Sequence, residues 1–122
     1  MKIITVDDSA TMRRIIKNSL VAIGYTDVIE AENGQAGLHK IESEAVECVI
    51  TDWSMPVMTG LELIRALRAN PKFQTLPILM VTALGQKEEI VQAITAGANG
   101  YIVKPFEPDT LQAKLQQVLG KA

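Results

Sequence analysis

The chain has 122 residues, of which 48% are hydrophobic, 21% charged and 4% aromatic, a profile typical of one ordinary globular domain. The net charge is −2 and the basic residues are scattered, which argues against nucleic acid as a direct partner. The longest uncharged stretches, residues 73–86 and 90–103, are too short to span a bilayer, and residues 3–6 are too few for a secretory signal. The single cysteine, Cys48, excludes an internal disulfide. We therefore expect one domain over residues 1–122, in the cytoplasm and without membrane insertion.

Short runs rich in β-branched residues alternate with longer segments in which apolar residues return every three or four positions, and this pair recurs along the chain. The short runs predict strands at residues 3–7, 27–31, 48–52, 78–82 and 100–103. The apolar stripes predict helices that include residues 12–23, 38–45, 63–67, 90–94 and 111–119. Residues typical of helix ends agree with this division: Asn33, Thr59 with Glu62, and Pro108 at helix starts, and Gly24, Asn70-Pro71 and Gly97 at helix ends.

Several of the predicted strands are apolar on both faces, as a parallel sheet covered by helices on both sides requires. Strands that are joined by helices run parallel, and their crossovers are right-handed. We therefore predict an α/β fold, a doubly wound three-layer sandwich whose five-stranded parallel sheet has the flavodoxin-like order 2-1-3-4-5. In such a sheet ligands bind beyond the carboxyl ends of the strands where the strand order reverses, here between the first and third strands.

Polar residues end or follow four of the predicted strands: Asp7 and Asp8, Asp52, Thr82 and Lys104. Each has an ordinary explanation, because acids and threonines cap helices, an Asp begins many turns, and a loop Lys is usually solvated. Capping does not explain all of them together, since Asp52 precedes a loop containing Pro56 and not a helix. We therefore interpret these residues as one functional site at the carboxyl edge of the sheet.

The chemistry of such a cluster follows from its charges. Two carboxylates about 4 Å apart repel each other by about 4 kcal/mol at an effective dielectric constant near 20, so the cluster needs a cation or a proton. A few oxygen ligands around an open side suit Mg²⁺, which commonly bridges to a phosphate. An ionised Asp beside Mg²⁺ and a Lys ammonium is a competent nucleophile toward phosphorus, because both cations stabilise charge on the phosphoryl oxygens. The cluster predicts an aspartyl phosphate.

A series of motifs, each weak alone, stands in a specific order and spacing: Val6-Asp7-Asp8-Ser9, Thr11-Met12-Arg13-Arg14, Asp52-Trp53-Ser54-Met55-Pro56, Gly60-Leu61-Glu62-Leu63, Leu79-Met80-Val81-Thr82-Ala83, Ala96-Gly97-Ala98 and Gly100-Tyr101-Ile102-Val103-Lys104-Pro105-Phe106. Through these motifs the sequence resembles, over essentially its whole length, the receiver domains of bacterial two-component signalling, and among them the stand-alone chemotaxis response regulators.

The resemblance implies a role for each site residue. Asp52 accepts the phosphoryl group, and Thr82 and Lys104 hold the phosphoryl oxygens. Asp8 and Asp52 bind Mg²⁺ together with the backbone carbonyl of Ser54, while Asp7 acts on the ion chiefly through water. The resemblance further implies a cis peptide bond before Pro105.

The resemblance also implies a signalling protein and not an enzyme that acts on external substrates. The chain receives its phosphoryl group from a phosphohistidine of a separate histidine kinase and later hydrolyses its own aspartyl phosphate. Its single histidine, His39, falls on the second predicted helix, away from the strand ends, and we expect it at the surface. The other expected partners are a flagellar motor switch protein and a phosphatase, and we expect the chain to be a monomer.

Phosphorylation adds negative charge and acceptor oxygens at Asp52, and Thr82 and Lys104 move to satisfy them. In receivers the space that this threonine leaves admits an aromatic side chain, and Tyr101 matches that position here. The ordinary alternative for Tyr101 is an aromatic residue packed in a strand. The resemblance also implies an output face that consists of the fourth helix, the fifth strand and the fifth helix, with candidate contacts at Lys87, Ile90, Ile94, Tyr101, Val103 and Lys114.

Two alternative functions stay open from the sequence: a phosphate sink in a branched relay, and a receiver domain separated from a DNA-binding response regulator. A flavin-binding relative of the same fold is disfavoured, because Asp7 and Asp8 would repel the flavin phosphate. Leu84, two residues after Thr82, is apolar where an acid or amide could orient a water molecule. We expect no assistance to hydrolysis from that position.

Overall fold

The computed structural model describes residues 1–83 and 87–120. In chain order the elements are β1 (Lys2–Val6), α1 (Ala10–Ala22), β2 (Asp27–Ala31), α2 (Gly34–Ser43), β3 (Cys48–Asp52), α3 (Gly60–Ala69), the 3₁₀ turn η1 (Pro71–Phe73), β4 (Ile78–Thr82), α4 (Lys87–Ala96), β5 (Gly100–Val103) and α5 (Pro108–Val118). Four of the five predicted strands have these bounds, and the first one begins at Lys2 and ends at Val6, one residue earlier than predicted at both ends.

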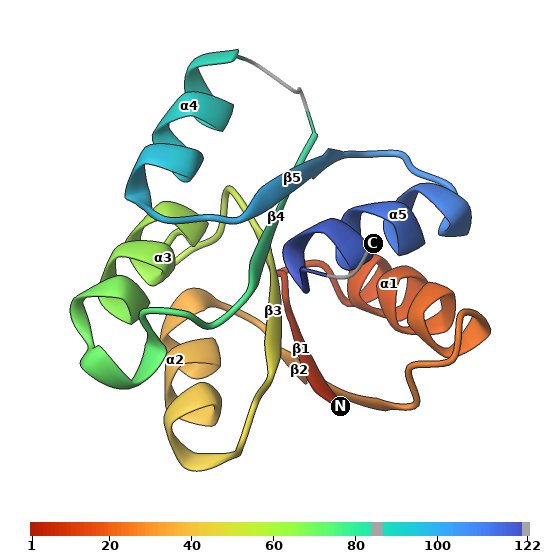
Figure 1. Cartoon of the computed structure of the whole chain (residues 1–122), viewed down its shortest axis with the longest axis horizontal. Coiled ribbons are helices and arrows are strands. Elements are labelled where there is room, and N and C mark those ends of the chain that lie inside the picture. The colour runs from red at the N-terminus through yellow and green to blue at the C-terminus, as the bar shows by residue number, and fades with distance from the viewer. Residues whose placement is uncertain (84–86, 121–122) are drawn as a thin grey trace.

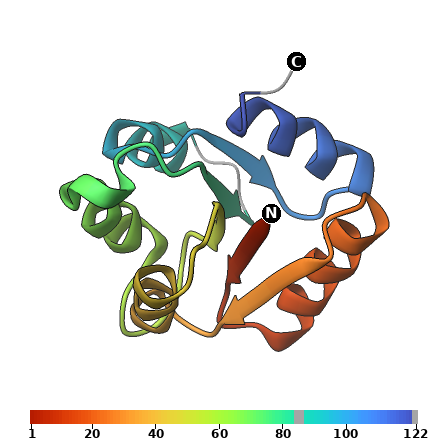
Figure 2. The ribbon, with the colours of Figure 1, turned by 60° about the horizontal axis from the view of Figure 1, so that its bottom comes forward.

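The five strands form one parallel sheet in the order β2-β1-β3-β4-β5. Helices α1 and α5 cover one face of this sheet, and α2, α3 and α4 cover the other (Figure 1). Seen from a second direction, the sheet lies between these two helical layers (Figure 2). The predicted flavodoxin-like sandwich is confirmed.

The two faces of the sheet belong to two separate hydrophobic cores. Along β1, Ile3 packs into the core under α1 and α5, while Ile4 packs into the core under α2, α3 and α4, because successive side chains of a strand point to opposite faces. Both side chains are completely buried, as are Leu79 and Met80, which alternate in the same way along β4. Full burial of each such side chain stabilises the fold by roughly 1.5–3 kcal/mol, so the apolar strands hold the three layers together.

The helix ends carry the side chains that the sequence predicts for them. Thr59 and Glu62 form a reciprocal capping box at the start of α3, and the Asn33 side chain accepts a hydrogen bond from an amide in the first turn of α2. Gly24 and Gly97 follow α1 and α4 with φ values of 103° and 124°, a left-handed conformation that glycine adopts without strain.

Cys48 is completely buried, and burial raises the pKa of its thiol to about 12. It therefore packs as a small apolar residue, as its place in a hydrophobic strand predicts. Within the described residues, no helix combines the length and the hydrophobicity needed to cross a membrane.

Candidate functional site

Three aspartates meet at the carboxyl edge of the sheet, where β1 and β3 lie side by side. Asp52 is the last residue of β3, and Asp7 and Asp8 follow β1. One carboxylate oxygen from each of the three lies within 4.8 Å of the others, with Asp7 and Asp52 buried and Asp8 exposed. At 4.8 Å and an effective dielectric constant near 20, two such charges repel each other by about 3.5 kcal/mol. The cluster therefore forms an acidic pocket open to solvent on the Asp8 side.

Lys104, directly after β5, supplies a positive charge to this pocket. Its Nζ lies 3.1 Å from Asp52 Oδ1 and 3.3 Å from Asp7 Oδ2. The Lys104 side chain is only 17% exposed, so it is not the solvated loop charge that the sequence left open. Its peptide bond to Pro105 is cis, as the family resemblance implies.

The loop after β1 is fixed by hydrogen bonds that leave the acids free of helix capping. The backbone amide of Ser9 donates to Asp7 Oδ1 at 2.9 Å, and the Arg13 guanidinium donates to the Asp7 carbonyl at 2.6 Å. The helix cap is Ser9, whose hydroxyl accepts from the amide of Met12. The alternative in which Asp7 and Asp8 cap α1 is therefore wrong.

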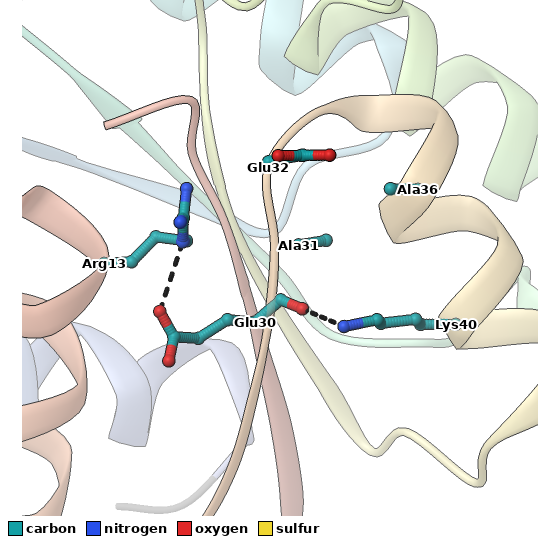
Figure 3. Close-up of a pocket in the computed structure, with 6 residues that line it drawn as sticks. All are labelled: Arg13, Glu30, Ala31, Glu32, Ala36 and Lys40. Atoms are coloured by element: carbon teal, nitrogen blue, oxygen red, sulfur yellow. Dashed lines mark hydrogen bonds and ion pairs between the residues drawn. The ribbon is translucent and has the colours of Figure 1, made fainter. Parts of the chain in front are cut away.

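Arg13 and Glu30 also border a second cavity, of about 350 Å³, which lies between α1 and α2 beyond the edge strand β2 (Figure 3). Arg13 Nε pairs with Glu30 Oε1 at 3.1 Å, and Lys40 Nζ donates to the Glu30 carbonyl. Both cations are thus engaged with Glu30. Through Arg13, this arrangement holds the end of β1 and with it the backbone of Asp7.

Gly60 fixes the end of β3, a role that the sequence did not reveal. Its amide donates to the Trp53 carbonyl at 3.0 Å, and a Cβ at this position would lie 2.1 Å from the backbone oxygen of Asp52. The first turn of α3 approaches the backbone of Asp52 so closely that only glycine fits.

The environment shifts the pKa values of the two central groups in the same direction. Burial, and next the charge of Asp7, raise the pKa of Asp52, and the hydrogen bond and charge of Lys104 only partly offset this. For Lys104, burial lowers the pKa, but the hydrogen bonds and charges of Asp52 and Asp7 outweigh it, so that the pKa is raised. Lys104 is therefore a permanent cation at neutral pH, and the Asp52 carboxylate is held at an electrostatic cost.

A cavity of about 150 Å³ opens beside Asp52, and its walls are Asp52, Trp53, Ser54, Thr82, Ala83, Glu89 and Lys104. Thr82 is 1% exposed, and its hydroxyl donates to Glu89 Oε2 at 3.1 Å. The structure thus brings Asp52, Thr82 and Lys104 to one cavity beside the acidic pocket. Glu89 was missed, because an acidic residue in the first turn of a helix is ordinary in a sequence.

The donor set of the acidic pocket fits a hard divalent cation. All three side chains offer carboxylate oxygens, the ligand type that Mg²⁺ prefers, whereas a zinc site would need His or Cys. The three carboxylates and one ammonium leave an excess of two negative charges, which one divalent ion balances. Ser54 is exposed on the loop after Asp52 and lines the neighbouring cavity of about 150 Å³. Its backbone carbonyl is the further oxygen ligand that the family resemblance implies.

The residues predicted for the output face lie on α4, β5 and α5. Tyr101 is half-buried, and Lys114 Nζ lies 5.0 Å from its ring centroid, within the range of a cation–π interaction. Ile94 and Val103 are exposed, and the remaining candidates, Lys87 and Ile90, are in the first turn of α4. His39 is exposed on α2, as predicted, whereas Leu84 lies outside the described residues.

Comparison with known proteins identifies the class to which this fold and site belong. Residues 3–116 match the response regulator receiver domain family, and the chain belongs to this family. It is 51% identical over 121 residues to the chemotaxis protein CheY1 of Helicobacter pylori, covering 98% of both chains. It is 52% identical over 121 residues to a CheY homolog of Campylobacter jejuni, covering 98% of this chain and 93% of that protein. The crystallised chemotaxis protein CheY4 of Vibrio cholerae has a TM-score of 0.89 and 38% identity, with 96% of this chain and 97% of that chain covered.

Proposed function

We propose that the chain is the phosphorylated messenger of a chemotaxis system, which accepts a phosphoryl group on Asp52 and then changes its α4-β5-α5 face. The observation that carries this proposal is the position of Asp52, at the end of β3 between two further aspartates and the Lys104 ammonium. Family membership and the similarity to chemotaxis proteins named CheY support the same function. We propose that residues 1–122 work as one receiver domain.

In the proposed reaction an Asp52 carboxylate oxygen attacks the phosphorus of a phosphohistidine on a histidine kinase. An O–P bond forms, the P–N bond to the imidazole breaks, and the imidazole leaves with a proton from solvent. Lys104 stabilises the charge on the phosphoryl oxygens, since its ammonium already lies 3.1 Å from Asp52. Hydrolysis of the aspartyl phosphate, by attack of water on phosphorus, returns Asp52 and free phosphate.

The proposed magnesium ligands are the carboxylates of Asp8 and Asp52 and the carbonyl of Ser54, with Asp7 acting through water. When bound, the ion would supply positive charge that stabilises the phosphoryl oxygens. The chain's own contribution is to hold the carboxylates together, which the Ser9 amide and the Arg13 guanidinium do for Asp7.

Phosphorylation changes the demand for hydrogen bonds at the strand ends. A phosphoryl group adds negative charge and three acceptor oxygens, and Thr82 and Lys104 are among the donors that border the cavity. Movement of Thr82 toward Asp52 makes room for a buried Tyr101 ring. The conformation with the ring buried is thereby stabilised within an equilibrium that already exists before phosphorylation. A complete change from 1:99 to 99:1 requires about 5.5 kcal/mol, so we propose a partial shift that the partner completes.

The proposed partner of the changed face is a flagellar motor switch protein, and the other partners are a histidine kinase and a phosphatase. Exposed apolar side chains at Ile94 and Val103, together with the half-buried Tyr101 ring, suit the apolar side of an amphipathic peptide. The cytoplasmic location and the monomeric state stay predictions.

The proposal is tested with acetyl phosphate and Mg²⁺. We expect Trp53, which borders the cavity beside Asp52, to change its emission first with Mg²⁺ and again with acetyl phosphate. Mass spectrometry of the intact protein should then show one added phosphoryl group. Asp52→Asn should abolish the second response and the added mass, whereas Asp109→Asn, an exposed acid in the first turn of α5, should preserve both. An unmodified parent protein would refute the function.

A further inference from the structure

Glu89 reaches into the phosphoryl cavity from the first turn of α4. Its Oε2 accepts the hydrogen bond of the Thr82 hydroxyl at 3.1 Å, and it forms part of the same cavity wall as Asp52 and Lys104. Thr82 belongs to β4 and Glu89 to α4, so this hydrogen bond joins the sheet to the first helix of the proposed output face.

A threonine hydroxyl carries one proton and can donate it to one acceptor at a time. In this structure the Thr82 hydroxyl donates its hydrogen bond to the Glu89 carboxylate. The proposed phosphoryl group on Asp52 would need the same proton for one of its oxygens. Glu89 and the phosphoryl group are therefore competitors for Thr82.

The charges act in the same direction as this competition. The cavity measures about 150 Å³ and already contains the Asp52 carboxylate, with Lys104 as the cation among its lining side chains. A phosphoryl group adds between one and two negative charges to this space. The Glu89 carboxylate, which lines the same cavity, repels it, so phosphorylation favours a conformation in which Glu89 has left.

A simpler explanation for Glu89 is that an acid in the first turn of a helix interacts well with the helix dipole. Its neighbour Glu88 fits that explanation, because it is exposed and borders a different surface hollow with Lys87, Val91 and Gln92. Glu89 differs from Glu88 in its bond to a buried hydroxyl and in its place on the phosphoryl cavity wall.

We propose that Glu89 is a positioning residue that holds Thr82 in the resting state and competes with the phosphoryl group for its hydroxyl. Phosphorylation breaks the hydrogen bond between Thr82 and Glu89 and releases the first turn of α4. Glu89 directly precedes Ile90 in this turn, and both Ile90 and Ile94 belong to the proposed output face. This inference rests on the proposed function, since it names how that site is held inactive.

The test uses beryllofluoride, a small mimic of the phosphoryl group, with the whole chain at saturating Mg²⁺ and Trp53 emission as readout. Glu89→Gln should bind beryllofluoride more tightly by on the order of fivefold, the effect of weakening one competing hydrogen bond. Glu88→Gln removes the same charge from the same helical turn and should bind like the parent. In a Thr82→Val background the gain from Glu89→Gln should be clearly smaller. Equal affinities of Glu89→Gln and the parent would overturn the inference, and so would a gain of the same size in the Thr82→Val background.

Two further measurements separate competition from a merely structural role. If Glu89 only supports the fold, Glu89→Gln lowers both the unfolding stability and the beryllofluoride affinity, whereas competition predicts that the affinity rises. The Thr82 methyl resonance of the Mg²⁺-free protein should shift in Glu89→Gln and stay in place in Glu88→Gln. This NMR measurement requires no phosphoryl mimic. If the resonance does not shift, the inference is refuted even if Asp52 is phosphorylated. If it shifts clearly, the hydrogen bond between Thr82 and Glu89 is supported even if Asp52 is not phosphorylated.

Discussion

Replacement of Lys104 by Met tests how the acidic pocket is stabilised. Met has a similar length and apolar character to the lysine stem, so Lys104→Met mainly removes the ammonium. At an effective dielectric constant near 20, the contacts at 3.1 and 3.3 Å correspond to gross attractions of about 5 kcal/mol each. Burial of the ammonium offsets much of this, and the usual net cost of breaking a buried pair is about 3–5 kcal/mol. We expect the free energy of unfolding to fall by about 3 kcal/mol at neutral pH without Mg²⁺.

The loss should depend on pH in a definite direction. Lys104 lowers the pKa of Asp52, so its removal raises a pKa that burial and Asp7 already hold above the ordinary value of 3.8. A carboxyl whose pKa is higher in the folded state destabilises the fold progressively as pH rises from its unfolded value through its folded value. The loss in Lys104→Met should therefore be small near pH 4 and complete above the folded pKa. In the parent, the raised pKa of Lys104 keeps its ammonium charged throughout this range, and the charge is lost only in strongly alkaline solution.

The assay is urea unfolding in EDTA at about pH 8 and about pH 4, compared with the parent at each pH. Lys2→Met is the matched control, because Lys2 Nζ lies 3.2 Å from Glu44 but both side chains are considerably exposed. Such a surface pair contributes under about 1 kcal/mol. Mg²⁺ should restore part of the loss in Lys104→Met and leave Lys2→Met unaffected. An equal loss at both pH values would show that packing of the lysine stem, and not its charge, stabilises the pocket.

Three further substitutions probe the loop after β3 and the output face. Gly60→Ala should destabilise the fold by roughly 2–3 kcal/mol despite the better helix propensity of Ala, because the added Cβ would lie 2.1 Å from the Asp52 carbonyl oxygen. Urea unfolding measures the loss of stability, and the Mg²⁺ response of Trp53 should weaken as well. An unchanged stability would contradict the close approach. Val57→Asn should stabilise the fold by about 1 kcal/mol, because Val57 is β-branched and 72% exposed and has a left-handed φ of 68°, which Asn adopts more readily. In the same urea assay Val91→Asn, which changes an exposed valine inside α4, should show no gain in stability. Tyr101→Ala should leave phosphorylation of Asp52 intact and weaken binding of a motor switch peptide by roughly tenfold, as loss of an aromatic anchor does; an unchanged affinity in a titration of the phosphorylated variant would remove Tyr101 from the mechanism.

The strands and the carboxyl edge of the sheet could be predicted because their signals are local. Each strand is a short buried run, and the acids end two such runs, so the topology brings Asp7 and Asp52 together. The strand order could be predicted from the flavodoxin-like arrangement that is common for five-stranded doubly wound sheets, together with right-handed crossovers.

The remaining features depend on contacts between segments that are far apart in the chain. Ser9 and not Asp7 caps α1, a choice between neighbouring cap residues that only the backbone geometry decides. Gly60 carries the signal of a helix start, but its packing on Asp52 requires the position of α3. Glu89 became visible only when the orientation of α4 brought it to the hydroxyl of Thr82.

The ion pair between Lys104 and Asp7 joins residues 97 positions apart, and β5 must be in place before it can form. A nascent chain whose last strand is still inside the ribosome has Asp7 and Asp52 but lacks the ammonium of Lys104. The proposed phosphorylation of Asp52 with Lys104 in place thus requires that β5 has docked on β4.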